Sequence, residues 1–106
     1  MKDAIVIGTR PEIIKCAPII KEYDKNGVDL IIIHTNQHYS FNMDEIFFKE
    51  LELRTPDHNL QVGSGSQAVQ TSKIMTRVEK LLQDNDIGCI MVQADTNTVL
   101  GAALAA

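Results

Sequence analysis

Residues 3–18 read Asp-Ala-Ile-Val-Ile-Gly-Thr-Arg-Pro-Glu-Ile-Ile-Lys-Cys-Ala-Pro, an apolar run followed by a glycine turn and an amphipathic segment. The apolar run predicts a buried strand over residues 3–8, and the spacing that follows predicts a helix over residues 10–26. Pro11 suits the first turn of this helix, because its missing N–H would have no partner there. A buried strand that leads through a glycine turn into a helix is typical of anion sites in α/β proteins.

Arg10 and Lys15 add two cations beside this predicted helix start. Phosphate sites commonly combine the planar fork of an arginine with the point charge of a lysine. Glu12 lies between them in the sequence and would orient one of the cations through an ion pair. The alternative is a solvated first turn with a structural ion pair between Arg10 and Glu12. The residues by themselves leave both interpretations open.

Strand and helix patterns alternate along the rest of the chain. The run Leu-Ile-Ile-Ile at residues 30–33 is apolar on both faces, as in a central parallel strand covered by helices. We expect a helical segment over 42–52, with its apolar side at Ile46, Phe47, Leu51 and Leu53. The remaining predictions are strands over 58–60 and 88–92, a helix over 67–84 capped by Ser66, and a last helix after Asp95. This alternation predicts an α/β, Rossmann-like, three-layer fold with a parallel sheet.

Composition narrows the class of protein. The chain has 106 residues, 44% of them hydrophobic, and a net charge of −4, which suits one small domain and argues against general nucleic-acid binding. No segment resembles a secretory signal or is long enough to span a membrane, so we expect a cytoplasmic protein. Cys16 and Cys89 lie in a predicted helix and a predicted strand, and we expect both to be buried free thiols.

Polar residues follow the second predicted strand as His34-Thr35-Asn36-Gln37-His38. This segment falls at the carboxyl end of a strand, where open α/β sheets bind ligands. A metal site would need a third ligand that the segment does not offer, so we predict no metal. The alternatives are hydrogen bonding to a sugar nucleotide, or a helix-capping loop with one partly buried histidine.

Two further segments have both a structural and a functional interpretation. Residues 63–67 read Gly-Ser-Gly-Ser-Gln, which fits a flexible connector or a loop whose amides approach an anion, but lacks the ending of a P-loop. Asp95 follows the predicted strand over 88–92. It serves either as the cap of the last helix or as a functional carboxylate at a strand end.

Residues 8–15, 35–38, 63–67 and 93–98 carry motifs that closely resemble, in order and spacing, those of the non-hydrolysing UDP-N-acetylglucosamine 2-epimerases. The resemblance covers essentially the whole chain. It implies a glycosyltransferase-B-type enzyme with two Rossmann-like domains and an active site between them. Residues 1–106 would be a truncated amino-terminal domain, without the UDP-binding domain. The last helix is apolar all round and fits this interpretation, since such a helix requires burial.

The resemblance also assigns roles to individual residues. Arg10 and Lys15 match family residues that contact the nucleotide sugar, and Asp95 matches an essential active-site carboxylate with a proposed acid/base role. Gln37 and His38 match positions that bind a second, activating substrate molecule in bacterial members. Ala94 departs from the glycine that the family usually has before this aspartate.

The implied reaction interconverts UDP-N-acetylglucosamine and UDP-N-acetylmannosamine, by elimination of UDP and its re-addition, without a cofactor or metal. We expect the complete enzyme to be a homodimer, and this chain alone to be inactive. A glycosyltransferase or sugar-nucleotide hydrolase of the same fold stays an alternative, because fold does not determine the reaction. A non-catalytic binding fragment is the other alternative.

Overall fold

The computed structural model describes residues 2–35, 46, 48–63, 65–93 and 97–106, and for residues 10 and 97–99 it describes the backbone only. The strands of this part are β1 (Lys2–Ile7), β2 (Leu30–His34), β3 (His58–Asn59) and β4 (Ile87–Met91). They form one sheet in the order β3-β2-β1-β4, and every neighbouring pair is parallel. The strand predictions are therefore confirmed to within about two residues at each end.

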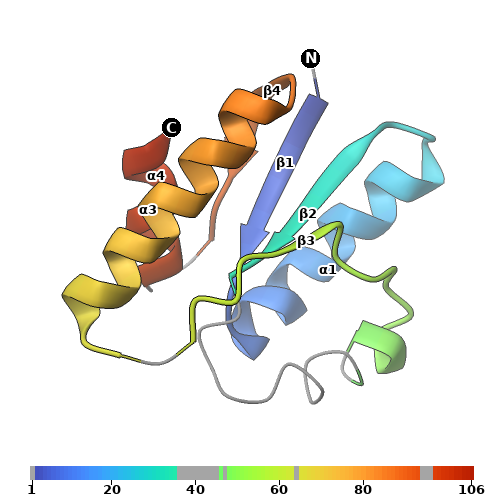
Figure 1. The fold of residues 1–106 in the computed structure, drawn as a ribbon. Coiled ribbons are helices and arrows are strands. Elements are labelled where there is room, and N and C mark those ends of the chain that lie inside the picture. Colours follow the sequence, from blue (N-terminus) through green and yellow to red (C-terminus); the bar gives the residue numbers. More distant parts are fainter. Residues whose placement is uncertain (1, 36–45, 47, 64, 94–96) are drawn as a thin grey trace.

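Helices cover both faces of this sheet (Figure 1). Helix α1 (Arg10–Lys25) packs on one face, and α3 (Gln67–Asp84) and α4 (Asn97–Ala105) pack together on the other. Parallel neighbours require such crossovers, because a chain must return to the same end of the sheet before it starts the next strand. The predicted α/β fold with three layers is confirmed.

The alternation of side chains along β1 explains the two cores. Ile5 and Ile7 belong to the cluster under α1, whereas Ala4 and Val6 belong to the cluster under α3 and α4. In each cluster the β1 residues are at most 1% exposed. A central strand with helices on both faces needs apolar residues at every position, which is the pattern seen in the sequence.

Local signals at the start of α3 and after α1 explain where these helices begin and end. Ser66 Oγ accepts a hydrogen bond from the amide of Val69 at 3.2 Å, so Ser66 caps α3 as predicted. Helix α1 ends at Asn26, and Gly27 follows with φ +67°, a conformation that glycine adopts without strain.

The prediction for residues 42–52 was partly wrong. Residues 48–50 are helical, and Phe48 and Leu53 are buried at 2% and 8% exposure. Ile46, predicted on the apolar side, is instead 57% exposed. Phe48, which the prediction did not place on the apolar side, belongs to the core cluster under α1, and Phe47 lies outside the described residues.

The prediction that both cysteines are buried was also partly wrong. Cys16 in α1 is 1% exposed, but Cys89 in β4 is exposed. Among the described residues β4 pairs only with β1, and its middle positions Gly88 and Cys89 face solvent. The apolar run predicted a strand covered on all sides, but a strand at the edge of a sheet has a neighbour on one side only and is less covered.

Helix α4 buries one narrow side. Gly101 and Ala102 are buried, and Leu100 and Leu104 are 52% and 59% exposed. A Cβ on Gly101 would lie 2.6 Å from Cγ2 of Ile74, so α3 and α4 approach each other closely at this glycine. None of the helices in the described part of the chain is long and apolar enough to cross a membrane.

Candidate functional site

The carboxyl ends of β1 and β2 bring two of the predicted motifs together. Ile7 pairs with His34 in the parallel register, and the amide of Thr35 donates to the carbonyl of Ile7 at 2.9 Å. Gly8 and Thr35 therefore follow neighbouring strands at the same edge of the sheet. This is the edge at which open α/β sheets bind ligands.

The five predicted site residues differ in how far the structure describes them. Arg10 is the first residue of α1, with only its backbone described, and Lys15 is exposed in the second turn. Gln37, His38 and Asp95 lie outside the described residues. Their roles stay predictions.

Glu12 has a role that the sequence analysis did not include. Its Oε1 accepts hydrogen bonds from the amides of Gly8 at 2.8 Å and Thr9 at 2.9 Å. The Glu12 side chain is buried, with 1% of the residue exposed. This is a capping box, in which the third helical residue reaches back to the amide before the helix.

His34 and Thr35 are buried at the end of β2. The His34 ring lies 6.1 Å from the Phe48 ring, centroid to centroid, at an interplanar angle of 59°. The carbonyl of His34 accepts from the amide of Leu60, and that of Thr35 from the amide of Val62, so the chain beyond β3 continues beside β2. In the part of the chain that the structure describes, no group of three histidine, cysteine or acidic side chains could hold a metal ion.

Side chains of α3 hold the segment that leads into the glycine-containing loop. Gln70 Nε2 donates to the carbonyl of Gly63 at 3.0 Å. Arg77 Nη1 donates to the carbonyls of Leu60 and of Gln61, the latter at 2.8 Å. The sequence analysis missed both side chains. Their spacing of seven residues places them on the same side of α3, which is the one signal that the sequence offered.

Gln93 follows β4 at the same edge of the sheet. Its amide oxygen Oε1 is buried and has no hydrogen-bond partner among the described residues. An unpaired buried acceptor costs free energy. A donor from the rest of the site, or from a ligand, would therefore be stabilising at this position.

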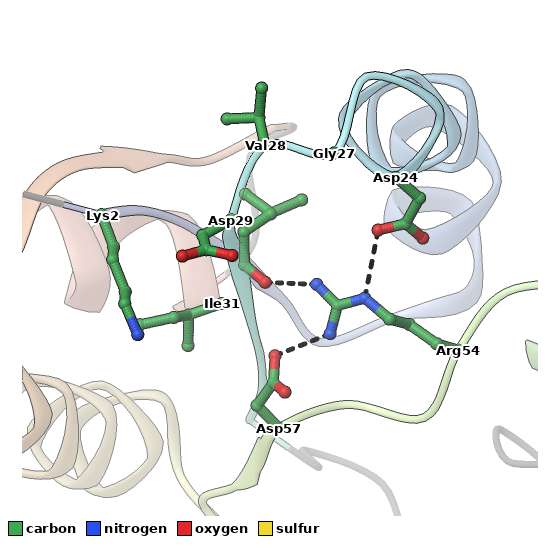
Figure 2. A pocket seen from close by; sticks show the side chains of 9 residues that line it. Lys2, Asp24, Gly27, Val28, Asp29, Ile31, Arg54 and Asp57 are labelled. Carbon is green, nitrogen blue, oxygen red and sulfur yellow. Dashed lines mark hydrogen bonds and ion pairs between the residues drawn. The ribbon is translucent and has the colours of Figure 1, made fainter.

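A cavity of about 410 Å³ opens at the opposite, amino-terminal edge of the sheet (Figure 2). In Figure 2 the Arg54 guanidinium lies between Asp24 and Asp57, with Nε 3.3 Å from Asp24 Oδ1 and Nη1 2.9 Å from Asp57 Oδ2. Its Nη2 donates to the carbonyl of Leu30, and Asp57 Oδ2 accepts from the amide of Ile32 at 2.7 Å.

Arg54 acts as a structural clamp in this cavity. Burial lowers the pKa of its guanidinium, but the hydrogen bonds and charges of Asp57 and Asp24 outweigh burial and raise that pKa above its usual value. All three guanidinium nitrogens already have protein partners, which ties the end of α1 to the start of β2. The sequence analysis did not include this cluster.

The comparison with known families decides the assignment. The family described as UDP-N-acetylglucosamine 2-epimerase matches residues 21–106. The chain belongs to this family. The resemblance inferred from the motifs is confirmed.

Relatives of known name are similar over the full chain. The UDP-N-acetylglucosamine 2-epimerase of Methanocaldococcus jannaschii is 54% identical over 106 residues, and that of Methanococcus maripaludis is 52% identical over 105. A UDP-2,3-diacetamido-2,3-dideoxy-D-glucuronate 2-epimerase of Pseudomonas aeruginosa is 35% identical over 107 residues. These alignments cover 99–100% of this chain, and the chain spans only 28–30% of the length of these relatives.

Solved structures give the same result. The Methanocaldococcus jannaschii UDP-GlcNAc 2-epimerase in complex with UDP-GlcNAc and UDP superposes with a TM-score of 0.93 at 53% identity, over 99% of this chain and 29% of that one. The Neisseria meningitidis enzyme bound to UDP-GlcNAc superposes with a TM-score of 0.88 at 32% identity, over 99% of this chain and 28% of that one.

Proposed function

We propose that the chain forms part of an enzyme that inverts C2 of UDP-N-acetylglucosamine to give UDP-N-acetylmannosamine. The observation that carries the proposal is the TM-score of 0.93 with a 2-epimerase crystallised with UDP-GlcNAc and UDP. Because identity to that enzyme is 53%, both the backbone and about half of the side chains of this region are shared.

The proposed organisation is an amino-terminal domain that works with a second domain. The chain spans 29% of the Methanocaldococcus jannaschii relative, which leaves room in that protein for a further domain of similar fold. We propose that UDP is bound mainly by such a domain, that the complete enzyme is a homodimer, and that residues 1–106 alone do not turn over substrate.

The C2 proton is too weakly acidic to be removed by itself, so the proposed mechanism couples its removal to the departure of UDP. The bond between C1 and the diphosphate oxygen breaks, the C2 proton leaves, and 2-acetamidoglucal forms. A proton then returns to the other face of C2, and UDP adds back to C1. The departing diphosphate carries growing negative charge, which Arg10 or Lys15 would stabilise.

Asp95 is the proposed acid/base group at C2, because a positioned carboxylate can take or give a proton on the face that it contacts. Inversion then requires a second proton donor or acceptor on the opposite face of C2. Gln37 and His38 are proposed to bind a second, activating molecule of UDP-N-acetylglucosamine. Lys15 is exposed on α1, so its ammonium is accessible to a ligand that binds at the carboxyl edge of the sheet.

One alternative substrate also has support from a relative. The Pseudomonas aeruginosa relative at 35% identity is named as the 2-epimerase of a diacetamido glucuronate nucleotide. Identity is higher to relatives named as UDP-N-acetylglucosamine 2-epimerases, at 54% and 52%, which favours the simpler sugar. Both substrates undergo inversion at the same carbon.

The test incubates the native gene product with UDP-N-acetylglucosamine in D2O and follows C2 by proton NMR. We expect deuterium at C2 together with signals of UDP-N-acetylmannosamine. Asp95→Asn should lower kcat by about 10²–10⁴-fold, the usual contribution of an acid/base group. An unchanged C2 position would reject the epimerase, and near-normal turnover by Asp95→Asn would reject the acid/base role.

The 106-residue chain by itself is the second arm of this test. We expect no deuterium exchange at C2 and no UDP-N-acetylmannosamine with this chain at any protein concentration. Measurable epimerisation by the purified chain would show that one domain is sufficient, and would reject the proposed division of labour.

A further inference from the structure

The start of α1 already contains an anion, the carboxylate of Glu12. One oxygen, Oε1, accepts from the amides of both Gly8 and Thr9, at 2.8 and 2.9 Å. Bonds from an amide to a carboxylate are stronger than bonds between neutral groups. With 1% of Glu12 exposed, bulk water has little access to this carboxylate and does not compete for its two hydrogen bonds.

The beginning of a helix attracts anions because its first amides point outward and its dipole is positive there. In this chain few amides around the start of α1 are available to an external anion. Pro11 has no N–H, and the amides of Gly8 and Thr9 are both used by Glu12. The glycine turn therefore resembles a phosphate site in which the Glu12 carboxylate occupies the position of the phosphate.

We propose that Glu12 is a positioning residue, which fills the anion site at the start of α1 and thereby sets the backbone of the turn that leads into Arg10. A ligand phosphate would then bind side chains such as those of Arg10 and Lys15, and not the amides of Gly8 and Thr9. The part of this inference that concerns the nucleotide diphosphate rests on the proposed function, whereas the occupancy by Glu12 does not.

The buried environment of Glu12 continues along α1 to Cys16. Cys16 lies one turn further along α1, and the pKa of its thiol is raised by burial and, secondarily, by the negative charge of Glu12. Cys16 is also buried, at 1% exposure.

The experiment titrates inorganic phosphate into the ¹⁵N-labelled chain and follows the amide signals of Gly8 and Thr9. In the unmodified chain we expect these two signals not to move. In Glu12→Ala we expect both amide protons to shift upfield before phosphate is added, because their acceptor is gone. Phosphate should then move them saturably, with an affinity at least about tenfold higher than in the unmodified chain.

Two variants separate this role from a general loss of stability. Glu12→Gln keeps an oxygen in the Oε1 position, so its amides should remain bonded and phosphate should remain excluded. Glu79→Ala removes an exposed glutamate from α3 and should leave the signals of Gly8 and Thr9 unchanged. Formate should raise the Tm of Glu12→Ala and not that of Glu79→Ala, since a small carboxylate replaces the one removed.

Saturable shifts of Gly8 and Thr9 by phosphate in the unmodified chain would overturn the proposal, and this arm needs no variant to fold. Unchanged amide signals in Glu12→Ala would overturn it as well. Because inorganic phosphate is the probe, these results do not depend on epimerase activity. Failure of the proposed function would instead appear as an unchanged C2 position in the nucleotide sugar.

Discussion

Individual residues of one type differ in chemistry because of where the fold puts them. Cys16 lies under α1 with 1% exposure, and Cys89 lies at an exposed position of β4. Burial and the nearby charge of Glu12 raise the pKa of the Cys16 thiol, so less of it is thiolate at a given pH. The thiolate is the reactive form, so the two cysteines should differ in reactivity.

We predict that iodoacetamide at pH 8 modifies Cys89 more than about ten times faster than Cys16. Raising the pH should accelerate the reaction of Cys16, because its raised pKa leaves it mostly protonated at pH 8. Mass spectrometry of peptides after timed quenching measures both rates, and Cys89→Ser should remove the fast phase. Equal rates at the two sites would contradict the burial of Cys16.

At the scale of elements, the contact between α3 and α4 depends on a missing side chain. Gly101 faces Ile74, and an added Cβ would lie 2.6 Å from Ile74 Cγ2 and 3.2 Å from the carbonyl oxygen of Thr71. Ile74 is fully buried, so it has little room to move away. The close approach of α4 to α3 therefore depends on this glycine.

We predict that Gly101→Ala lowers the free energy of unfolding by about 1–2 kcal/mol. Overpacking costs about 1–3 kcal/mol, and the better helix propensity of alanine offsets about 1 kcal/mol of it. Gly65→Ala is the matched control, since its Cβ would meet only Val69, at 3.4 Å, and should change stability by less than about 0.5 kcal/mol. Urea unfolding measures both, and a Gly101→Ala variant as stable as the control would reject the close contact.

The clamp at the amino-terminal edge joins three elements through Arg54. Its ion pairs involve side chains that are 34–45% exposed, and pairs this exposed contribute little. The bond to the carbonyl of Leu30 is partly buried, and it also fixes the direction of the guanidinium. The carbonyl bond, and not the charge, should account for most of the stabilisation.

We predict that Arg54→Lys lowers the free energy of unfolding by about 1–2 kcal/mol, because an ammonium cannot reach Leu30, Asp24 and Asp57 at once. Asp24→Asn removes one exposed ion pair and should cost less than about 0.5 kcal/mol. Thermal unfolding by circular dichroism measures both variants. An equal cost for the two would mean that the ion pair with Asp24 dominates.

At the scale of the whole molecule, α4 exposes two large apolar side chains next to each other. Leu100 and Leu104 are one turn apart and more than half exposed, at 52% and 59%. Adjacent exposed leucines on one side of a helix favour association, because pairing removes their surface from water.

We predict that the 106-residue chain self-associates, and that Leu100→Glu combined with Leu104→Lys shifts it toward the monomer. Val28→Glu is the control, since Val28 is similarly exposed, at 51%, but lies outside α4. Size-exclusion chromatography with light scattering at several protein concentrations gives the mass. A monomeric parent chain, or equal masses for the parent and the double variant, would contradict the prediction.

The sequence was most informative where local patterns and long-range packing agree. The apolar run of β1, the proline at the start of α1 and the serine cap of α3 are local signals, and each predicted its element. The motifs at the strand ends predicted the family in the same way, because they are contiguous in the chain. The predicted roles of Gln37, His38 and Asp95 lie outside the described residues and stay untested.

Other features depend on residues far apart in the chain. The exposure of Cys89 follows from the place of β4 in the sheet order. Arg54 bonds to Asp24 and Leu30, which lie 30 and 24 residues earlier in the chain, and the packing of α1 against β2 brings these two residues together. The hold of Arg77 on the 60–61 segment likewise requires α3 to cross over it. No local pattern contains such contacts.

The sequence by itself determined the order of strands and helices, their caps and the family to which the chain belongs, because short-range periodicity and contiguous motifs encode them. Only the tertiary structure decided which apolar residues are buried and that Glu12 turns its carboxylate back onto Gly8 and Thr9. Burial and hydrogen bonding are properties of the assembled layers, since a side chain meets its partners only after the helices have packed on the sheet.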